Sequence, residues 1–392
     1  MSLENHFSDR AHRMKPAAIR DILRHASKPG MIPFIAGQPV PELFPTKAIG
    51  YQANQVFETM GPDVLQYGDS QGYEPLRQWA AAQTKTGRPE NVLIVSGSQQ
   101  ALDLTAKLFV DEGDKVIVAA PTYSGALGTY SVYGCDYLSV ACDGEGMLPD
   151  ALEEAMSQKP SLIYCIPNYM NPTGVHMSLA RRQHLVEQAQ KHGVLIVEDD
   201  PYGELRFEGE RLPNLVELAP EHVIYASTFS KTIAPGLRLA WMVAPDWAIG
   251  KLITAKQTSD LQSSTYAQRF LAEVLEDDFM DRQLMQLQTY YRKQRDMMVS
   301  ALEREMPPEV KFARPTGGMF VWCELPKHID ATQLLKKAIE QNVAYMPGSA
   351  FYADDDQGHH TLRLSFTLAT EEQINTGIAT LGRIFAEAIA GV

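Results

Sequence analysis

The chain has 392 residues, a length that suits two domains or one large α/β domain with an appendage. Hydrophobic residues make up 45% of the chain and charged residues 21%, which is typical of a soluble globular protein. The formal net charge of −13 argues against a nucleic-acid-binding protein, because such a protein needs a broad cationic face.

The cysteines and the first residues indicate a cellular compartment. The four cysteines form no CxxC pair, which favours reduced thiols over disulfides or a zinc site. Residues 1–15 are polar and lack the apolar segment of a signal peptide. No stretch is long and apolar enough to span a membrane. We therefore expect a cytoplasmic protein that binds neither membrane nor nucleic acid.

The first ninety residues predict helices around an irregular arm. A short helix is predicted over residues 16–27, and two more over 46–60 and 73–86. Four prolines and a glycine in residues 31–45 predict an extended arm without regular structure. Because this arm is also apolar, we expect it to lie over another part of the protein.

From residue 91 onwards, short apolar strands alternate with helices. The predicted strands are 92–96, 115–119, 137–141, 161–166, 194–198, 222–226 and 239–243. This alternation indicates an α/β domain with a mostly parallel, seven-stranded sheet that is covered on both faces. Ligands of such sheets bind outside the carboxyl ends of the strands. The residues that follow each strand are therefore the candidates for a functional site.

The last part of the chain predicts a second, smaller α+β unit. Residues 247–305 are rich in helix signals, and the later elements are strands at 319–324, 343–346 and 362–367 and helices at 331–341 and 371–389. We place the boundary near residue 305, so that a large domain spans 46–305 and a small domain spans 306–392. The helix and arm within residues 1–45 are expected to pack with the small domain.

Uncharged polar residues follow three of the predicted strands. Ser98 and Gln99 lie at a predicted helix start, where backbone N–H groups can bind a phosphate, although a serine there can also be an ordinary N-cap. Tyr123 could stack on a planar ring or belong to the core. Asn171, in the turn Asn-Pro-Thr-Gly, could point its amide into the crevice at the strand ends or serve the turn alone.

Charged residues follow two more strands. Asp199 ends a buried strand, where a carboxylate needs a partner, either a metal ion or a protonated pyridine nitrogen. No histidine or second acidic cluster supports the metal. Lys231 stands among the hydroxyls of Thr228 and Ser230 and precedes Arg238. A desolvated lysine is a nucleophile, and hydroxyls with an arginine bind phosphate, so this stretch suggests pyridoxal phosphate (PLP), with a surface lysine in a Ser/Thr-rich loop as the alternative.

The predicted strand at 362–367 carries a further charged residue, Arg363, between two leucines. A buried arginine needs a carboxylate partner. That partner could be the carboxylate of a substrate or an acidic side chain in a structural salt bridge.

In their order and spacing, these motifs resemble the class I/II aminotransferases, which are PLP enzymes of fold type I. Within that family the sequence is most similar to the subgroup of 2-aminoadipate aminotransferases and kynurenine aminotransferase II. The resemblance covers about residues 16 to 370. The matching motifs are Ala36-Gly-Gln-Pro-Val-Pro-Glu-Leu-Phe-Pro45, Leu65-Gln-Tyr67, Ser96-Gly-Ser-Gln-Gln100, Asn171-Pro-Thr-Gly174, Glu198-Asp-Asp-Pro-Tyr202, Ser230-Lys231 with Arg238, and Leu362-Arg-Leu-Ser-Phe366.

The resemblance implies a role for each matched residue at the cofactor. Lys231 would bind PLP covalently and then act as the base that moves a proton between the substrate Cα and the cofactor. Asp199 would pair with the protonated ring nitrogen, and Asn171 and Tyr202 would hydrogen-bond the phenolic oxygen. Tyr123 would stack on the ring. The residues that would hold the phosphate are Ser98, Gln99, Ser230 and Arg238, with Thr228 as a further candidate.

The resemblance also implies residues for the substrate and for a second subunit. Arg363 would bind the substrate α-carboxylate bidentately, close to Asn171, and Gly37 would lie against the substrate. Tyr67 would reach the phosphate from the neighbouring subunit, which implies a homodimer with shared active sites. Arg20 matches an arginine on the subgroup's mobile N-terminal helix and is a candidate for binding a distal carboxylate, with a solvated helix arginine as the alternative.

The chain departs from the subgroup where the side-chain pocket is expected. The usual double glycine of the arm is Ala36-Gly37 here, followed by Gln38. A serine that is common before the Ile-Arg pair is Ala17. These changes border the pocket for the substrate side chain, so the resemblance defines the reaction better than it defines the substrate.

We therefore expect a homodimeric PLP-dependent aminotransferase with a ping-pong reaction. The donor would be a 2-aminoadipate-like, aromatic or large aliphatic L-amino acid, and the acceptor a 2-oxo acid, 2-oxoglutarate above all. On the same fold, a C–S lyase or an aminocyclopropane-carboxylate synthase-like enzyme is the alternative. A transcription regulator with an aminotransferase-like domain is a remote alternative, because the net charge opposes it and only about forty residues precede the large domain.

Overall fold

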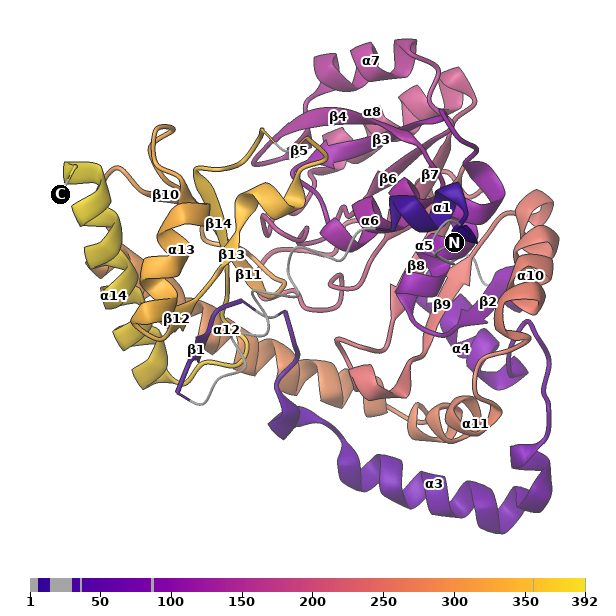
Figure 1. The fold of residues 1–392 in the computed structure, drawn as a ribbon. Helices are drawn as coiled ribbons and strands as arrows, with labels where there is room; N and C mark the ends of the chain where they lie inside the picture. Colours follow the sequence, from indigo (N-terminus) through magenta and orange to yellow (C-terminus); the bar gives the residue numbers. More distant parts are fainter. Residues whose placement is uncertain (1–5, 15–29, 36, 86–87, 355, 392) are drawn as a thin grey trace.

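The computed structural model describes residues 6–14, 30–35, 37–85, 88–354 and 356–391, and Figure 1 shows its fold. The helix predicted over residues 16–27, which includes Arg20 and Ala17, lies outside the described residues, and so does Ala36. The chain forms a large central sheet, a smaller antiparallel sheet beside it, and helices that cover both (Figure 1).

The large sheet contains all seven predicted strands. In spatial order its members are β2 (Val92–Val95), β9 (Ala240–Val243), β8 (Val223–Thr228), β7 (Leu195–Asp199), β6 (Leu162–Cys165), β3 (Lys115–Ala120), β4 (Asp136–Asp143) and β5 (Gly146–Met147). The run from β8 to β4 is parallel, and β9 is antiparallel to both of its neighbours. This confirms the mostly parallel α/β sheet.

The sheet has eight strands in the described part of the chain rather than the seven predicted, because a hairpin adds β5 at one edge. The hairpin turn is built by the Asp143 side chain, which accepts a hydrogen bond of 2.8 Å from the Glu145 backbone. Gly146 supplies the positive φ of +117° that closes the turn. A strand of two residues has too short an apolar pattern to be predicted from sequence.

Helices cover both faces of the large sheet, so its central strands are buried and mostly apolar. All residues of β2, β6, β7, β8 and β9 are buried. The covering helices are α4 (Glu74–Gln83), α5 (Ser98–Phe109), α6 (Ser124–Val132), α7 (Pro149–Ser157), α8 (Leu179–His192), α9 (Leu215–Leu218), α10 (Asp246–Asp260) and α11 (Thr265–Val274). Short 3-10 turns precede β2 and β9, at η4 (Pro89–Asn91) and η5 (Pro235–Leu237).

The C-terminal unit is a four-stranded antiparallel sheet with the spatial order β10 (Lys311–Phe312), β11 (Phe320–Glu324), β14 (Thr361–Ser365) and β13 (Met346–Pro347). Its helices are α13 (Ala331–Glu340), α14 (Glu371–Ala390) and the 3-10 turn η6 (Gly348–Phe351), and the long helix α12 (Phe279–Glu305) packs against α14. The strand predicted at 343–346 is two short strands, because β12 (Val343–Ala344) and β13 pair with different partners. In Figure 1 this unit is drawn in orange and yellow at one end of the large sheet.

The arm of residues 31–45 crosses from one unit to the other and is more regular than predicted. Its strand β1 (Ile32–Pro33) pairs in parallel with β12, and the Phe34 carbonyl accepts a hydrogen bond of 2.8 Å from Ser365 of the C-terminal sheet. Proline is compatible with this position because β1 lies at the edge of a two-stranded sheet. The arm continues through η2 (Pro41–Leu43) into α3 (Thr46–Met60) and η3 (Gly61–Leu65).

A short helix near the N-terminus, α1 (Asp9–Arg13), packs on α6 of the large sheet unit. Arg13 pairs with Glu112 at 3.0 Å, and the guanidinium of Arg10 lies 5.1 Å from the Tyr133 ring. Within the described residues, no helix has the length and apolarity that a membrane crossing needs.

Candidate active site

A cavity of about 470 Å³ opens at the carboxyl ends of the parallel strands, where the large sheet meets the C-terminal unit. The residues that line it are Gly37, Ser98, Gln99, Tyr123, Ile166, Asn171, Asp199, Pro201, Tyr202, Thr228, Ser230, Lys231, Pro235, Arg238, Phe320 and Arg363. Of the residues proposed from the sequence, Tyr67 does not line this cavity, and Arg20 lies outside the described residues. Strand ends, two loops and the arm therefore bring the other twelve into one cavity.

Asp199, the last residue of β7, places a buried carboxylate on the cavity wall. The Tyr164 hydroxyl donates a hydrogen bond of 2.9 Å to Oδ2, whereas Oδ1 has no partner among the described residues. Burial raises the pKa of Asp199 to about 7, and the hydrogen bond from Tyr164 opposes this rise. A buried carboxylate with one bare oxygen needs a positive partner in the cavity.

The acidic residues on either side of Asp199 have protein partners instead. Glu198 accepts hydrogen bonds of 2.9 and 3.0 Å from the backbone of Leu215 and Val216 at the start of α9. Asp200 accepts hydrogen bonds from the Gly203 backbone at 2.9 Å and from the Tyr225 hydroxyl at 3.1 Å. Of the three consecutive carboxylates, the one at position 199 is thus the one that faces the cavity.

One end of the cavity is suited to an anion. Ser98 and Gln99 form the first turn of α5, where the helix dipole and backbone N–H groups attract negative charge. Gly97 precedes them with a φ of +97°, and a Cβ there would lie only 2.3 Å from Nη2 of Arg238. Glycine is therefore required both for the backbone conformation and for the close approach of the guanidinium.

The opposite wall of this anion site comes from the loop between β8 and β9. The Thr228 hydroxyl donates to Ser230 Oγ at 2.9 Å, and the Ser230 backbone N–H donates back to Thr228 at 3.1 Å. Arg238 ends η5 in the left-handed conformation, with a φ of +52°, which is uncommon for a residue other than glycine. Its guanidinium donates to the Ser96 carbonyl at 3.4 Å, so the two walls are joined.

Lys231 lies between the anion site and the C-terminal unit. Its Nζ donates a hydrogen bond of 2.7 Å to the Gly37 carbonyl of the arm. Burial, together with the positive charges of Arg363 and Arg238, lowers the pKa of Lys231 to about 8. At neutral pH a useful fraction of this amine is therefore uncharged and nucleophilic.

Arg363, in the middle of β14, is 4% exposed and forms no ion pair with any described residue. Its Nη1 donates to Asn171 Oδ1 at 2.7 Å and its Nη2 to the Ile35 carbonyl at 2.6 Å, while Nε has no partner among the described residues. The rings of Phe320 and Phe351 lie 4.2 and 4.9 Å from the guanidinium. The structural salt bridge considered from the sequence is thus absent from the described part of the chain.

A fully buried arginine, Arg182 of α8, fastens the loop that carries Asn171. Its guanidinium donates to the carbonyls of Pro167, Met177 and Pro213 and to Asn168 Oδ1, at 2.6 to 3.3 Å. The loop that follows β6 is therefore tied to α8 and to the segment before α9. This tie fixes the position from which Asn171 reaches Arg363.

Two tyrosines complete the cavity. Tyr123 is the N-cap of α6, and its ring covers Gly125, where a Cβ would lie 2.4 Å from the ring. Tyr202 packs edge-on against Phe320, with ring centroids 5.8 Å apart. Burial raises the pKa of both hydroxyls, so both tyrosines are neutral and can donate hydrogen bonds at physiological pH.

Sequence reasoning missed several residues of the site. Four residues that line the cavity have no polar side-chain atom by which the sequence could identify them: Ile166, Pro201, Pro235 and Phe320. Tyr164 contacts Asp199 from within β6 and has the sequence pattern of an ordinary core residue. An aromatic hydroxyl inside an otherwise apolar strand is the one signal that could have drawn attention to it.

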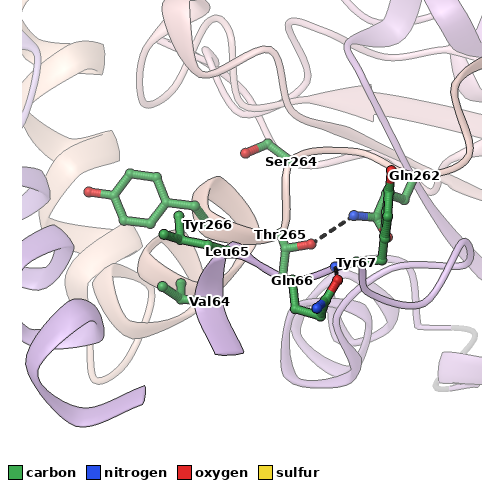
Figure 2. Close-up of a pocket in the computed structure, with 8 residues that line it drawn as sticks. All are labelled: Val64, Leu65, Gln66, Tyr67, Gln262, Ser264, Thr265 and Tyr266. Carbon is green, nitrogen blue, oxygen red and sulfur yellow. Dashed lines mark hydrogen bonds between the residues drawn. The ribbon is translucent and has the colours of Figure 1, made fainter. Parts of the chain in front are cut away.

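Tyr67 lies away from the cavity and is 78% exposed. It borders a separate, open cleft of about 420 Å³ between η3 and the start of α11, shown in Figure 2. The residues that line this cleft are Val64, Leu65, Gln66, Tyr67, Gln262, Ser264, Thr265 and Tyr266. Gln262 donates to Thr265 at 2.9 Å and accepts from the Gly68 backbone, so it holds the two walls together.

The cavity fits pyridoxal phosphate, the cofactor that the sequence resemblance implies. The anion site around Arg238 matches the phosphate, and the bare Oδ1 of Asp199 matches a protonated ring nitrogen. Tyr202 offers a neutral donor for the phenolic oxygen, and the amine of Lys231 lies in the same cavity. Arg363 remains as an additional cationic group.

Comparisons with known proteins point in the same direction. The family model described as aminotransferase class I and II matches residues 31–381. The chain is 42% identical to a 2-aminoadipate transaminase of Thermus thermophilus over 388 residues, covering 98% of this chain and 97% of that protein. It is 39% identical to aromatic-amino-acid aminotransferase 1 of Thermococcus litoralis over 400 residues, with coverage of 99% and 95%.

A solved structure with the same fold is the α-aminoadipate aminotransferase of Thermus thermophilus, determined in complex with N-(5'-phosphopyridoxyl)-L-leucine. It superimposes with a TM-score of 0.93 at 41% sequence identity, and the alignment covers 100% of both chains. The bound molecule in that structure is a covalent adduct of the PLP skeleton with an amino acid.

Proposed function

The chain belongs to the class I and II aminotransferase family of PLP-dependent enzymes, and we propose that it transfers the amino group of a 2-aminoadipate-like, aromatic or large aliphatic L-amino acid to 2-oxoglutarate. The names of two relatives, a 2-aminoadipate transaminase and an aromatic-amino-acid aminotransferase, support these substrates. The observation that carries the proposal is Arg363: a buried guanidinium without an ion pair among the described residues, facing the same cavity as Lys231.

The residues of the cavity have separate tasks in this proposal. When bound, PLP supplies an electron sink for the negative charge that develops at the substrate Cα. Asp199 holds positive charge at the ring nitrogen, which makes the ring a better sink. Lys231, with its pKa lowered to about 8, would accept the proton from the substrate Cα. Ser98, Ser230 and Arg238 hold the phosphate, and Tyr123 stacks on the ring.

In this proposal the Arg363 guanidinium, which protein hydrogen bonds hold in place, orients the substrate. Asn171 and the Ile35 carbonyl each accept a hydrogen bond from one Nη of Arg363. The bare Nε and the remaining Nη hydrogens are left for the two oxygens of an α-carboxylate. A 2-oxo acid presents the same carboxylate, so one site serves both halves of a ping-pong reaction.

The acceptor and donor side chains are proposed to lie beside the arm. Gly37 and Phe320 both line the cavity, and a Cβ at Gly37 would lie 2.5 Å from the Phe320 ring, so glycine is needed at this point of the wall. Arg20 is proposed to bind the distal carboxylate of 2-aminoadipate or 2-oxoglutarate, on the basis of the sequence resemblance. Arg20→Ala should then weaken the binding of 2-oxoglutarate more than that of a 2-oxo acid with an uncharged side chain.

We propose a homodimer in which Tyr67 completes the phosphate site of the partner subunit. The elements that precede Tyr67 support this, because Tyr51, Phe57 and Leu65 of α3 and η3 are also exposed, by 63%, 40% and 72%. Several exposed aromatic and aliphatic side chains on consecutive elements are typical of protein interfaces. In Figure 1, α3 lies along the outer edge of the large sheet unit, away from the C-terminal unit.

We further propose the domain limits and the cytoplasmic location that the sequence predicts. The limits 46–305 and 306–392 place the long helix α12 at the junction, and the contacts of β1 support packing of the arm with the small domain. A cytoplasmic location is supported by Cys165 and Cys323, which are buried free thiols of the kind that reducing compartments preserve.

The proposal is tested by the two half-reactions measured separately. The purified protein is loaded with PLP, and its visible absorbance is followed while single amino acids are added. A suitable donor should abolish the visible band, and 2-oxoglutarate should restore it. The active donors then define the substrate class. Lys231→Ala should show no covalently trapped cofactor after borohydride, and Arg363→Lys should raise the KM for donors that wild-type protein accepts.

Conversion of a cysteine conjugate to pyruvate and ammonia without any 2-oxo acid would instead identify a lyase. A PLP-loaded protein that no amino acid converts would contradict the transaminase proposal while leaving the cofactor site intact.

A further inference from the structure

Tyr164 is the one described side chain that hydrogen-bonds the carboxylate of Asp199. The parallel register of β6 and β7 places Tyr164 opposite Val197. Side chains alternate between the two faces of a strand, so Asp199, two residues after Val197, points to the same face as Tyr164. The hydroxyl therefore reaches the carboxylate from the neighbouring strand, at 2.9 Å, and from a fully buried position.

The two oxygens of Asp199 have different surroundings as a result. Oδ2 is held by Tyr164, whereas Oδ1 has no hydrogen-bond partner among the described residues, and Asp199 lines the cavity. A carboxylate with neither oxygen held could rotate about its Cβ–Cγ bond or turn away from the cavity. With Oδ2 fixed, the bare oxygen keeps one direction.

We propose that Tyr164 is a positioning residue of the transamination reaction: its hydroxyl fixes the Asp199 carboxylate so that Oδ1 meets the ring nitrogen of PLP. This inference rests on the role proposed above for Asp199. It assigns to the enzyme a partner for that carboxylate which does not touch cofactor or substrate.

A tyrosine suits this position because its hydroxyl is neutral. Lysine, arginine or protonated histidine would neutralise the negative charge that the ring nitrogen needs. Phenylalanine would leave Oδ2 buried and unpaired, which disfavours the charged carboxylate. Burial and the nearby Asp199 raise the pKa of the Tyr164 hydroxyl, so it remains a donor over the whole working range of pH.

The neighbouring Tyr130 offers a matched control. Its ring centroid lies 5.9 Å from that of Tyr164, and it is equally buried. Its hydroxyl, however, contacts Thr105 at 3.1 Å rather than Asp199. Tyr130→Phe and Tyr164→Phe therefore each remove one buried hydroxyl from the same layer of the core, and only the second change frees Oδ2.

The test compares the PLP-loaded wild type with Tyr164→Phe, Tyr130→Phe, Asp199→Asn and the Tyr164→Phe/Asp199→Asn double variant. The dissociation constant of PLP is measured by equilibrium dialysis, and the protonation of its ring nitrogen by NMR of 15N-labelled cofactor. Steady-state kinetics with the best amino donor give kcat and KM. Thermal unfolding reports on stability.

Tyr164→Phe should bind PLP about tenfold more weakly and lower kcat about tenfold, as expected for one hydrogen bond to a charged group. The KM for the donor should stay within about twofold, because Arg363 is untouched. The 15N resonance should move toward that of the unprotonated ring. In the double variant, Tyr164→Phe should add no further loss, since no carboxylate remains to be positioned.

Two results would overturn the proposal. If Tyr164→Phe matches Tyr130→Phe in PLP affinity, 15N shift and kcat, the hydroxyl only contributes to the core. If Tyr164→Phe is just as harmful in the Asp199→Asn background, it acts independently of that carboxylate. By contrast, a ring nitrogen that stays protonated in Asp199→Asn would refute the role of Asp199 itself, and the inference about Tyr164 with it.

Discussion

The lowered pKa of Lys231 can be measured directly in the cofactor-free protein. Burial of the amine and the charges of Arg363 and Arg238 lower this pKa from 10.5 to about 8. At pH 7 a pKa of about 8 leaves ~9% of the amine uncharged, against ~0.03% at the ordinary value, a ratio of about 300. The initial rate of covalent PLP capture should be larger than that of a surface lysine by a similar factor.

The assay mixes cofactor-free protein with limiting PLP between pH 7 and 10 and follows the visible band. The amine reacts in its uncharged form, so the rate should rise with pH through a midpoint near 8 and then level off. Borohydride trapping and peptide mass analysis show that Lys231 is the residue modified, and Lys231→Ala gives the background.

A pair of variants separates burial from charge. Arg363→Met removes one of the charges that lower the pKa, so the midpoint should move to higher pH. Arg363→Lys keeps a charge in place, so its midpoint should stay close to that of the wild type. A wild-type midpoint near 10.5, or an unchanged midpoint in Arg363→Met, would show that this account of the lysine is wrong.

Three further predictions concern the surroundings of the site. Gly97→Ala should weaken PLP binding at least tenfold in equilibrium dialysis, because the new Cβ would lie 2.3 Å from Arg238. The control Gly236→Ala should bind PLP normally, because nothing lies within 4 Å of its new Cβ. Arg182→Met should lower the free energy of unfolding in urea by about 3 kcal/mol, since it leaves several buried acceptors unpaired. Tyr67→Phe should weaken PLP binding about tenfold and leave the dimer intact in analytical sedimentation. A wild-type protein that is fully active as a monomer would exclude active sites shared between subunits.

The large sheet could be predicted because its central strands are buried on both faces and therefore contain runs of apolar residues, as in β6 and β7. The two-residue strands β1 and β5 could not, because their existence depends on a partner strand and a turn rather than on any pattern of their own. Pairing with β12 gives the arm a short strand, although its prolines on their own predict irregular structure.

The sequence predicted those cavity residues that are polar and follow the end of a strand. A carboxylate such as Asp199 is costly to bury and therefore conspicuous after an apolar run. Phe320 and Tyr164 are not conspicuous, because a cavity wall or a supporting hydroxyl has the same sequence pattern as core packing. The role proposed for Tyr67 requires a second chain, which no pattern within one chain describes.

The contacts of the arm have a consequence for how this enzyme can evolve. Its carbonyls at Ile35, Gly37 and Gln38 accept hydrogen bonds from Arg363, Lys231 and Thr367, respectively. A backbone carbonyl is the same whatever side chain its residue carries. Mutation can therefore change the side chain at position 38, which is exposed, while the arm continues to hold the lysine and the arginine. Selection can therefore change an arm side chain without altering the carbonyls that hold Arg363, Lys231 and Thr367.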